Sequence, residues 1–511
     1  MKKSLQKATL PSGWIRIPID DTGAYINGFA FKPGHRETQG LPIIRIQNLT
    51  NESKPLNRTA LTVPSEYHVA TGDMLMSWSA TLDIFIWRRE PALVNQHIFK
   101  VVPDKQVIDE RLLFHCLKLA IEQLLETEHL HGSTMKHINR GPFMAHEVVL
   151  PPRAEQTRIV EKLEELLSDL DAGVAELKAA QKKLIQYRQS LLKAAVEGTL
   201  TADWRAARGE GNAETETGAQ LLARILTERR SRWQTRQLAK FEAQGKTPPK
   251  DWHAKYPEPV APNAAGLPEL PLGWVWASID QLSPDDLANG RSVPTAETGA
   301  KVLRLTAVKQ GQIDLSQCKT GAWSVAEAKP FAVVQGDLLI VRGNGSLTLV
   351  GRAGMVPAVT EQVAYPDTMI RLRVVDSVVR PEWVGLLWDA SITRSHLETR
   401  ARTSAGIYKI SQPDIVSVVI PVPPLDEQDL MLSMFKQTSE EMQVVQAMVE
   451  RGLKQSAAQR KNILQAAFSG QLVPQDPADE PASALLARIR AERAVREAGS
   501  ARGRGKKKVS T

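Results

Sequence analysis

Two short strings carry residue types and spacings that could act on phosphates. Gly245-Lys246-Thr247 has the form of the end of a nucleotide-binding loop, in which backbone N–H groups and a lysine hold the phosphates. That motif needs glycine where Lys240 stands, and Pro248-Pro249 would stop the helix that must follow the loop. Glu327-Ala328-Lys329 matches the Glu-x-Lys of many nucleases, but a string this short arises by chance. We therefore assign no catalytic residue from either string.

Metal-binding patterns are equally weak. The two cysteines, Cys116 and Cys318, can form neither a disulfide framework nor a four-cysteine zinc site. The pair His129 and His131 has no cysteine or cluster of acids beside it that would complete a metal site. We expect no metal site, and we interpret these histidines as surface residues or as contacts to phosphate.

The composition limits the class of protein. The chain has 511 residues, enough for three or four domains, and its 42% apolar and 24% charged residues exclude a wholly disordered chain. Its net charge of +8 weakly favours a polyanionic partner. No secretory segment follows Met1, and no apolar run approaches the roughly 18 residues of a membrane span. We expect a soluble, cytoplasmic protein with no membrane partner.

The elements that must position any site come from one long internal repeat. The best-matched part needs no gap and keeps a constant offset of 272 residues. The matched stretches are 10–14 with 270–274, 43–46 with 302–305, 72–76 with 336–340, and 150–200 with 422–472. Because this period far exceeds that of a solenoid, the repeat is a domain followed by a helix, used twice.

Each copy begins with a variable block of mixed secondary structure. Residues 42–49 and 337–341 read as strands, because β-branched residues lie between turn signals. Residues 109–128 and 382–399 read as helices from their apolar periodicity. The blocks are therefore predicted to be mixed α/β globules.

A long helix follows each block and carries a heptad pattern. A diproline and then Glu155 or Glu427 suit the first turn of each helix, and Gly198 and Gly470 suit its end. The apolar seam suggests that the two helices pair with each other. The predicted pairing residues are Leu163, Leu170, Leu177, Leu184, Leu191, Phe435, Met442, Val449 and Ile463.

Pairing of these helices would define the architecture. Small residues at Gly173, Ala180 and Gly452 would allow close backbone approach. About 40 helical residues span roughly 60 Å. We expect two globular domains separated by two long antiparallel coiled-coil-like helices, with a pseudo-twofold relation between the copies.

These features resemble the DNA-specificity subunit of Type I restriction–modification systems. The motifs that carry the resemblance are Leu-Pro-x-Gly-Trp at 10–14 and 270–274, Gly-Asp-x-Leu at 72–75 and 336–339, Pro-Pro-x-x-Glu-Gln at 151–156 and 423–428, Gly-Ser-Thr-x-Lys-His-Ile at 132–138, and Ala-Ala-x-x-Gly-x-Leu at 194–200 and 466–472. The resemblance covers about residues 10–495. The second copy departs from it at 403–410, which read Thr-Ser-Ala-Gly-Ile-Tyr-Lys-Ile.

The resemblance implies a non-catalytic subunit. Two target-recognition domains would each read one half of a bipartite, asymmetric site in double-stranded DNA. The repeated helices would separate these domains and bind two copies of a DNA adenine methyltransferase subunit, which would supply S-adenosylmethionine. A restriction/translocase subunit that uses ATP and Mg²⁺ would complete the complex. This chain would bind no cofactor itself, and it lacks the Asn-Pro-Pro-aromatic and Phe-x-Gly-x-Gly strings of an adenine methyltransferase.

Within that interpretation, DNA contacts are expected from polar side chains beside glycines, in repeat-matched loops or next to strand ends. Arginine suits guanine and asparagine suits adenine in the major groove, while lysines position the phosphate backbone. The candidates are Lys32, His35, Arg36, Arg45, Asn48, Ser77, Trp78, Lys136, His137 and Arg140 in the first domain, and Arg291, Arg304, Arg342, Asn344, Ser346, Tyr408 and Lys409 in the second.

The whole chain is divided accordingly. The predicted segments are 1–150 (first target-recognition domain), 151–200 (central spacer helix), 201–270 (helical and proline-rich connector), 271–422 (second target-recognition domain), 423–472 (distal spacer helix), 473–497 (C-terminal helix) and 498–511 (basic tail). In the connector, residues 221–244 read as a charged helix on which Trp233 could dock on a partner. The basic tail is a candidate for non-specific DNA contact.

Three other functions stay open. The chain could serve a Type II system with a fused methyltransferase–nuclease, it could be a self-contained nuclease, or it could be a coiled-coil scaffold without sequence preference. The missing catalytic strings argue against the nuclease. A binding assay separates the scaffold, because a scaffold shows no preference among DNA sequences.

Overall fold

The computed structural model describes residues 9–125, 130–131, 137–208, 216–374, 378–404 and 406–506. The chain divides into two compact units. Unit 1 consists of Met1–Lys178 and Glu450–Thr511, and unit 2 consists of Ala179–Val449. No helix among the described residues is long and apolar enough to cross a membrane.

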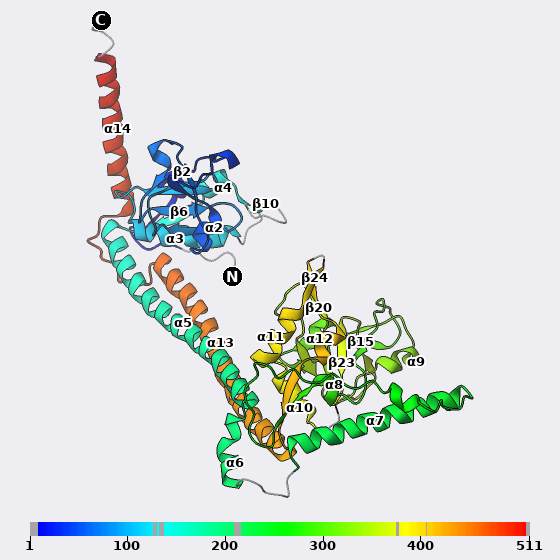
Figure 1. The fold of residues 1–511 in the computed structure, drawn as a ribbon. Helices are drawn as coiled ribbons and strands as arrows, with labels where there is room; N and C mark the ends of the chain where they lie inside the picture. Colours follow the sequence, from blue (N-terminus) through cyan, green and yellow to red (C-terminus); the bar gives the residue numbers. More distant parts are fainter. Residues whose placement is uncertain are drawn as a thin grey trace. The chain divides into compact units, whose positions relative to one another are not determined.

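Unit 1 contains two four-stranded sheets (Figure 1). The first has the order β2-β9-β6-β7, and all of its neighbours are antiparallel. The second has the order β4-β3-β8-β5, in which β3 and β8 are parallel. The strands are β2 (Gly23–Asn27), β3 (Leu41–Ile44), β4 (Asn57–Thr59), β5 (His68–Val69), β6 (Met74–Ser77), β7 (Asp83–Ile86), β8 (Ala92–Val94) and β9 (Ile98–Pro103).

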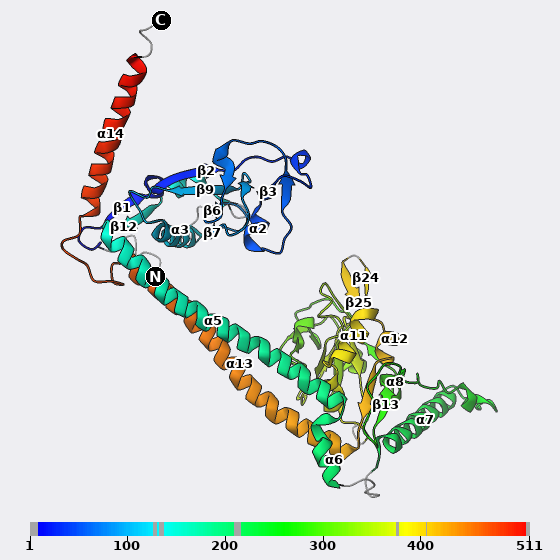
Figure 2. The same cartoon turned by 60° about the vertical axis from the view of Figure 1, so that its left-hand side comes forward.

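Strand β6 is buried on both faces. Met74 and Met76 join the core that includes helix α3 (Glu110–Leu125), which lies along the first sheet in Figure 2. Leu75 points to the other side and packs with Trp87 in a separate core. This explains why the sequence of β6 is a continuous apolar run and not an alternating one.

Smaller elements complete unit 1. Strand β1 (Ile15–Pro18) pairs antiparallel with β12 (Glu147–Leu150), and β10 (Leu130–His131) pairs with β11 (His137–Ile138). The other helices are α2 (Ile46–Thr50), α4 (Arg140–Met144) and α14 (Ala482–Lys506). The strand expected over 42–49 is therefore wrong in its second half, because the chain turns into α2 after β3. Helix α14 continues nine residues beyond the expected boundary at 497.

Unit 2 contains a six-stranded sheet with the order β14-β23-β19-β21-β17-β16. Its three-stranded sheets have the orders β18-β15-β22 and β20-β25-β24, and β13 pairs antiparallel with β26. The strands are β13 (Val275–Ser278), β14 (Ala288–Asn289), β15 (Lys301–Leu303), β16 (Val308–Lys309), β17 (Gln312–Ile313), β18 (Cys318–Thr320), β19 (Leu338–Val341), β20 (Gly343–Asn344), β21 (Ala353–Met355), β22 (Val363–Ala364), β23 (Met369–Leu372), β24 (Arg402–Ser404), β25 (Ile407–Lys409) and β26 (Val419–Val422).

Strand β19 repeats the arrangement of β6. Leu338 and Ile340 join the core of the helices, and Leu339 joins a second core on the other face. The helices are α6 (Ala202–Arg208), α7 (Gly218–Ala243), α8 (Ile279–Leu282), α9 (Val325–Ala328), α10 (Pro381–Leu387), α11 (Ser391–Arg400) and α12 (Gln412–Val416). The single helix expected over 382–399 is two helices, because the backbone at Ala390 is extended (ψ 144°).

The two longest helices are α5 (Arg153–Val196) and α13 (Leu425–Phe468), each of 44 residues. In unit 1, Arg460 contacts Asp171, and a Cβ on Gly452 would lie 3.0 Å from Leu177 Cδ1. The two helices therefore run antiparallel there. Gly173, which we expected at close approach, would meet nothing within 4 Å among the described residues, so that expectation is wrong.

The predicted pairing residues all lie partly or fully inside. Leu163 and Val449 are buried. The remaining seven are half-buried: Leu170, Leu177, Leu184, Leu191, Phe435, Met442 and Ile463. Trp233, which could dock on a partner, is half-buried and stacks on Trp252 with 5.6 Å between ring centroids.

Candidate DNA interface

The repeated motifs meet where each globular domain joins its long helix. In unit 1 the β1–β12 pair leads directly into α5, and Trp14 Nε1 donates a 2.8 Å hydrogen bond to Glu155 Oε2 in the helix's first turn. The neighbouring Gln156 side chain donates to the carbonyl groups of Val107 and Pro151 and accepts from the Asp109 N–H. This buried network fixes the start of α5 to the globular domain.

Unit 2 has the same junction. Strand β13 pairs with β26, and Trp274 Nε1 donates a 2.8 Å hydrogen bond to Glu427 Oε2 at the start of α13. The Gln428 side chain donates to the Pro423 carbonyl and accepts from the Arg380 N–H, just before α10. The spaced tryptophan, glutamate and glutamine of the repeat are thus structural partners, and DNA contacts must be sought elsewhere.

The two glutamates differ in their second carboxylate oxygen. Glu427 Oε1 accepts a 2.6 Å hydrogen bond from Thr201 Oγ1 and contacts the Arg205 guanidinium. Glu155 Oε1 is buried without a hydrogen-bond partner among the described residues. Burial raises the pKa of Glu155 above its ordinary value.

Each junction also receives the end of a long helix. Gly198, which follows α5, has φ +70°, and a Cβ there would lie 2.5 Å from Pro271 Cγ. Gly470, which follows α13, has φ +74° and would meet Pro11 in the same way. Only glycine fits such a left-handed position against a proline ring. Both contacts lie within a unit, the first within unit 2 and the second within unit 1.

The first-domain candidates with free surface lie at the ends of short helices. Lys32 and Arg36 flank a short 3₁₀ helix, and Arg140 begins α4; all three are exposed. His35 and Arg45 are half-buried. His137 lies in β11, and Lys136 lies outside the described residues.

Asn48 and Ser77 offer no side-chain surface to a ligand. Asn48 is 2% exposed, and its amide holds the carbonyl groups of Lys54 and Pro55. Ser77 is 0% exposed, and its hydroxyl contacts the Thr81 and Asp83 carbonyls. These polar side chains stabilise turns by hydrogen bonds to the backbone. A sequence pattern does not distinguish this role from DNA contact.

Trp78 lies half-buried beside two residues that the sequence did not single out. Its Nε1 donates a 3.2 Å hydrogen bond to Asn27 Oδ1, and its ring lies 5.2 Å from that of His97. Asn27 ends β2 and His97 precedes β9, the strand between β2 and β6. Their positions at strand ends next to a repeat-matched loop are the signal that could have identified them.

Four of the second-domain candidates lie together. Strand β20 pairs with β25, so that Gly343 faces Lys409 and Asn344 faces Tyr408. Arg342 joins them because its carbonyl accepts the Ile410 N–H. Arg342 and Lys409 are exposed. Ser346 follows this group, and its N–H donates to Asn344 Oδ1.

The two other second-domain candidates lie outside that pairing. Arg291 follows β14, and its N–H donates to the Tyr365 carbonyl. Arg304 follows β15 in the separate three-stranded sheet. Both side chains are exposed.

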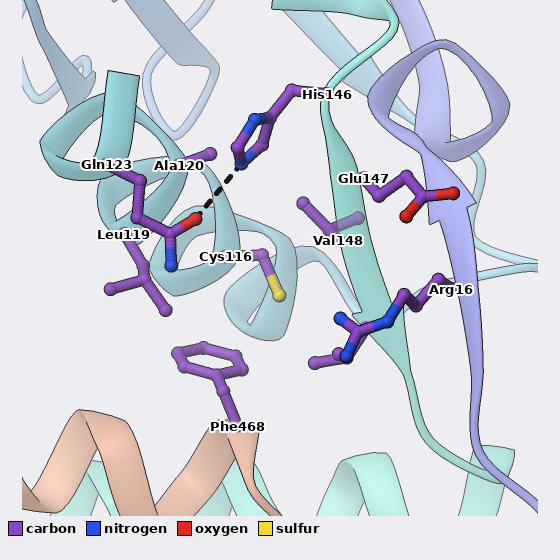
Figure 3. Close-up of a pocket in the computed structure, with 10 residues that line it drawn as sticks. Arg16, Cys116, Leu119, Ala120, Gln123, His146, Glu147, Val148 and Phe468 are labelled. Carbon is purple, nitrogen blue, oxygen red and sulfur yellow. Dashed lines mark hydrogen bonds between the residues drawn. The ribbon is translucent and has the colours of Figure 1, made fainter. Parts of the chain in front are cut away.

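A small cavity of about 40 Å³ lies in unit 1 beneath helix α3 (Figure 3). Its lining includes Cys116 and His146, and His146 Nε2 lies 3.1 Å from Gln123 Oε1. Burial raises the pKa of the Cys116 thiol and lowers that of His146, so both are neutral at pH 7. The volume suits about one water molecule and no cofactor. Among the described residues, no three His, Cys, Asp or Glu side chains gather in a way that could hold a metal ion.

The sequence is similar to those of known DNA-specificity proteins. Residues 11–183 match the model of the Type I restriction modification DNA specificity domain. The Type I restriction enzyme EcoKI specificity subunit of Escherichia coli (strain K12) is 24% identical, covering 95% of this chain and 97% of that protein. The EcoBI specificity subunit of Escherichia coli is 23% identical over 95% of this chain and 94% of its own length.

A solved structure shares the fold. One chain from a study of complex assembly and conformational transition of the type I R-M system has a TM-score of 0.54 and 14% identity, and covers 91% of this chain and 100% of its own. The mixed α/β fold is thereby confirmed. The chain is thus similar over nearly its whole length to DNA-specificity subunits of Type I restriction enzymes, and residues 11–183 match the specificity-domain model.

Proposed function

We propose that this chain is the sequence-reading subunit of a Type I restriction–modification complex and performs no chemistry itself. The observation that carries the proposal is the duplicated junction, in which Trp14 with Glu155 and Trp274 with Glu427 attach one domain to one long helix. A domain fixed to a helix at its first turn can present its loops at a defined angle. Two such domains suit a DNA site made of two unlike halves.

The loops carry charge suited to that role. Lys32, Arg36, Arg140, Arg342 and Lys409 are exposed, and no ion pair is found for them among the described residues. Exposed cations at loops position a protein on the phosphate backbone, whereas amide and guanidinium groups read base edges. In the proposal, unit 1 reads one half-site and unit 2 reads the other.

The long helices carry a second surface. Ile185 and Tyr187 of α5 are 63% and 51% exposed, and Val444 and Met448 of α13 are 60% and 64% exposed, all within unit 2. Large apolar side chains left exposed on both helices favour a protein contact here. We propose that a methyltransferase subunit binds here. The family resemblance implies that a second copy binds the helices of unit 1 and that a restriction/translocase subunit joins the complex.

In this proposal the cofactors bind to the partner subunits and not to this chain. S-adenosylmethionine would belong to the methyltransferase, and ATP with Mg²⁺ to the restriction/translocase subunit. The antiparallel helices would act as the spacer that sets the distance between half-sites. The complex would act on DNA in the cytoplasm.

A binding selection tests the proposal. The full chain, purified with its methyltransferase partner, is mixed with duplexes that contain a long randomised region, and the bound DNA is sequenced. We expect two unlike short motifs at a fixed spacing of roughly one helical turn. Enrichment of no sequence would favour the scaffold alternative and overturn the proposal, and cleavage by this chain alone with Mg²⁺ would favour a nuclease.

A further inference from the structure

The ends of three neighbouring strands form a corner in unit 1. Asn27 ends β2, His97 precedes β9 and Trp78 follows β6, and these strands are adjacent in the sheet. The Trp78 N–H donates to the His97 carbonyl, and Trp78 Nε1 donates to Asn27 Oδ1. Asn27 is exposed. The corner is polar and aromatic and carries no fixed charge.

The same corner recurs in unit 2 at the same register. Asn27 lies opposite Phe99 and Ser77 opposite Ile98 in unit 1. Asn289 lies opposite Ile370 and Val341 opposite Met369 in unit 2. By this register, Asn27 corresponds to Asn289, His97 to Thr368, and Trp78 to Arg342.

A backbone hydrogen bond supports the correspondence. The Arg342 N–H donates to the Thr368 carbonyl at 2.8 Å, as the Trp78 N–H does to that of His97 at 3.3 Å. The two corners therefore have the same backbone arrangement and an asparagine at the same position, but differ in the other two side chains.

The polar groups at these corners are available to bind a ligand. Ala80, two residues after Trp78, has φ +61°, which costs a non-glycine residue free energy. His97 Nδ1 is buried with no hydrogen-bond partner among the described residues. Asn289, Arg342 and Thr368 are exposed, and no side-chain hydrogen bond or ion pair is found for them in the described parts of the chain. A buried polar atom without a partner and a strained residue close by, together with exposed side chains that no other side chain engages, are features expected of a ligand site.

The chemistry of the side chains selects base edges over phosphates. In unit 1 the three corner residues offer amide, imidazole and indole groups and carry no charge. The Arg140 guanidinium lies 5.6 Å from the Phe99 ring, whose centroid is 6.1 Å from that of Trp78, so a phosphate contact beside the corner falls to Arg140 and the corner is left for the bases. Asn27 Oδ1 is engaged by Trp78, which leaves the Nδ2 donors for an acceptor such as a purine N7. In unit 2, Arg342 can donate two hydrogen bonds to guanine O6 and N7, beside the amide of Asn289.

We propose that these two corners are base-contact sites in which Asn27 with His97, and Asn289 with Thr368, determine the two half-sites. This inference rests on the proposed DNA-reading function. A shared asparagine would contact one base pair in each half-site. The change from Trp78 and His97 to Arg342 and Thr368 would make the two readings differ, and would place a guanine in the half-site read by unit 2.

The experiment repeats the binding selection with single variants of the full chain. Asn27→Ala and His97→Ala should lower the preference at one or two base pairs of one half-site by about tenfold or more. Asn289→Ala and Thr368→Ala should do the same in the other half-site only. Asn263→Ala, an exposed asparagine in the connector, is the matched control and should leave the selected sequence unchanged.

Two outcomes overturn the inference in distinguishable ways. If the parent chain selects a bipartite sequence and all four variants select it with unchanged preferences, the corners do not read bases and the proposed function stands. If the parent chain selects no sequence, the proposed function fails and the inference fails with it. Melting temperatures equal to that of the parent show that each variant is folded.

Discussion

Substitution of Gly198 by alanine tests whether the end of α5 must dock on the second junction. Gly198 has φ +70°, and an added Cβ would lie 2.5 Å from Pro271 Cγ and 3.2 Å from Trp274 Cη2. Trp274 is the residue that donates to Glu427 at the start of α13. The alanine would therefore press on the group that attaches domain and helix in unit 2.

The loss of folding stability has two parts, which a second glycine of the same unit allows us to measure separately. Placing alanine in the left-handed region costs about 1–2 kcal/mol. Forcing a methyl group against packed atoms costs about 1–3 kcal/mol more. Gly245 has φ +61° and nothing within 4 Å, so Gly245→Ala suffers only the first part. We expect Gly198→Ala to destabilise unit 2 by about 2–5 kcal/mol and Gly245→Ala by about 1–2 kcal/mol.

Calorimetry and hydrogen exchange together measure this difference. At about 2 °C per kcal/mol for a unit of this size, Gly198→Ala should lower one melting transition by about 4–10 °C. Faster exchange should appear around residues 271–278 and 419–428, and not in unit 1. A Gly198→Ala shift no larger than that of Gly245→Ala would show that the helix end does not depend on the proline contact, and would refute the reasoning.

Single substitutions of the two junction glutamates, of Arg342 and of the exposed helix surface should each have a distinct effect. Because burial raises the pKa of folded Glu155, folding takes up a proton as the pH falls, so Glu155→Gln should be at least as stable as the parent at pH 7 in thermal melts and lose that gain on acidification. Glu427→Gln should cost roughly 2–3 kcal/mol, because it removes the carboxylate that pairs with Arg205; equal melting of the two variants would contradict this. Arg342→Ala should relax the selected sequence in one half-site only, and uniform weakening on all duplexes would instead make Arg342 a phosphate contact. Met448→Glu should abolish co-purification with the methyltransferase while leaving the melting temperature unchanged, and retained co-purification would place that partner elsewhere.

The repeat made much of the architecture predictable. Helix α5 begins at Arg153 and ends at Val196, inside the span that the diproline and Gly198 bracket, because helix ends are local events. Leu163 of α5 and Val449 of α13 are buried, as expected for residues on the apolar face that a heptad period gives each helix. The sequence also identified the motifs at the junctions, but did not reveal which residues of these motifs contact each other. Trp14 and Glu155 lie 141 residues apart, and only the β1–β12 pairing brings them together.

The candidate contacts were less predictable for a physical reason. Ser77 and Asn48 have the same residue types as DNA contacts, but their hydrogen-bonding groups are used by nearby backbone carbonyls. Asn27 and His97 could not be predicted as site residues, because their proximity to Trp78 depends on the order of the strands in the sheet, which the sequence alone does not determine. The chemistry of a side chain can be read from its residue type. Whether its hydrogen-bonding groups are free to bind DNA depends on the hydrogen bonds that they already make in the fold.

The asymmetry between Glu155 and Glu427 follows from the same duplication. Both must accept from a tryptophan, so neither can be lost without loosening a junction. Glu427 gains Thr201 and Arg205 from the segment that links α5 to the second domain, and the offset of the repeat puts Val473 and Pro477 at the equivalent positions in the other copy. Neither replacement can donate a side-chain hydrogen bond, which leaves Glu155 Oε1 unsatisfied. The junction of unit 1 is therefore expected to be the weaker of the two, and its stability is expected to depend on the protonation of Glu155.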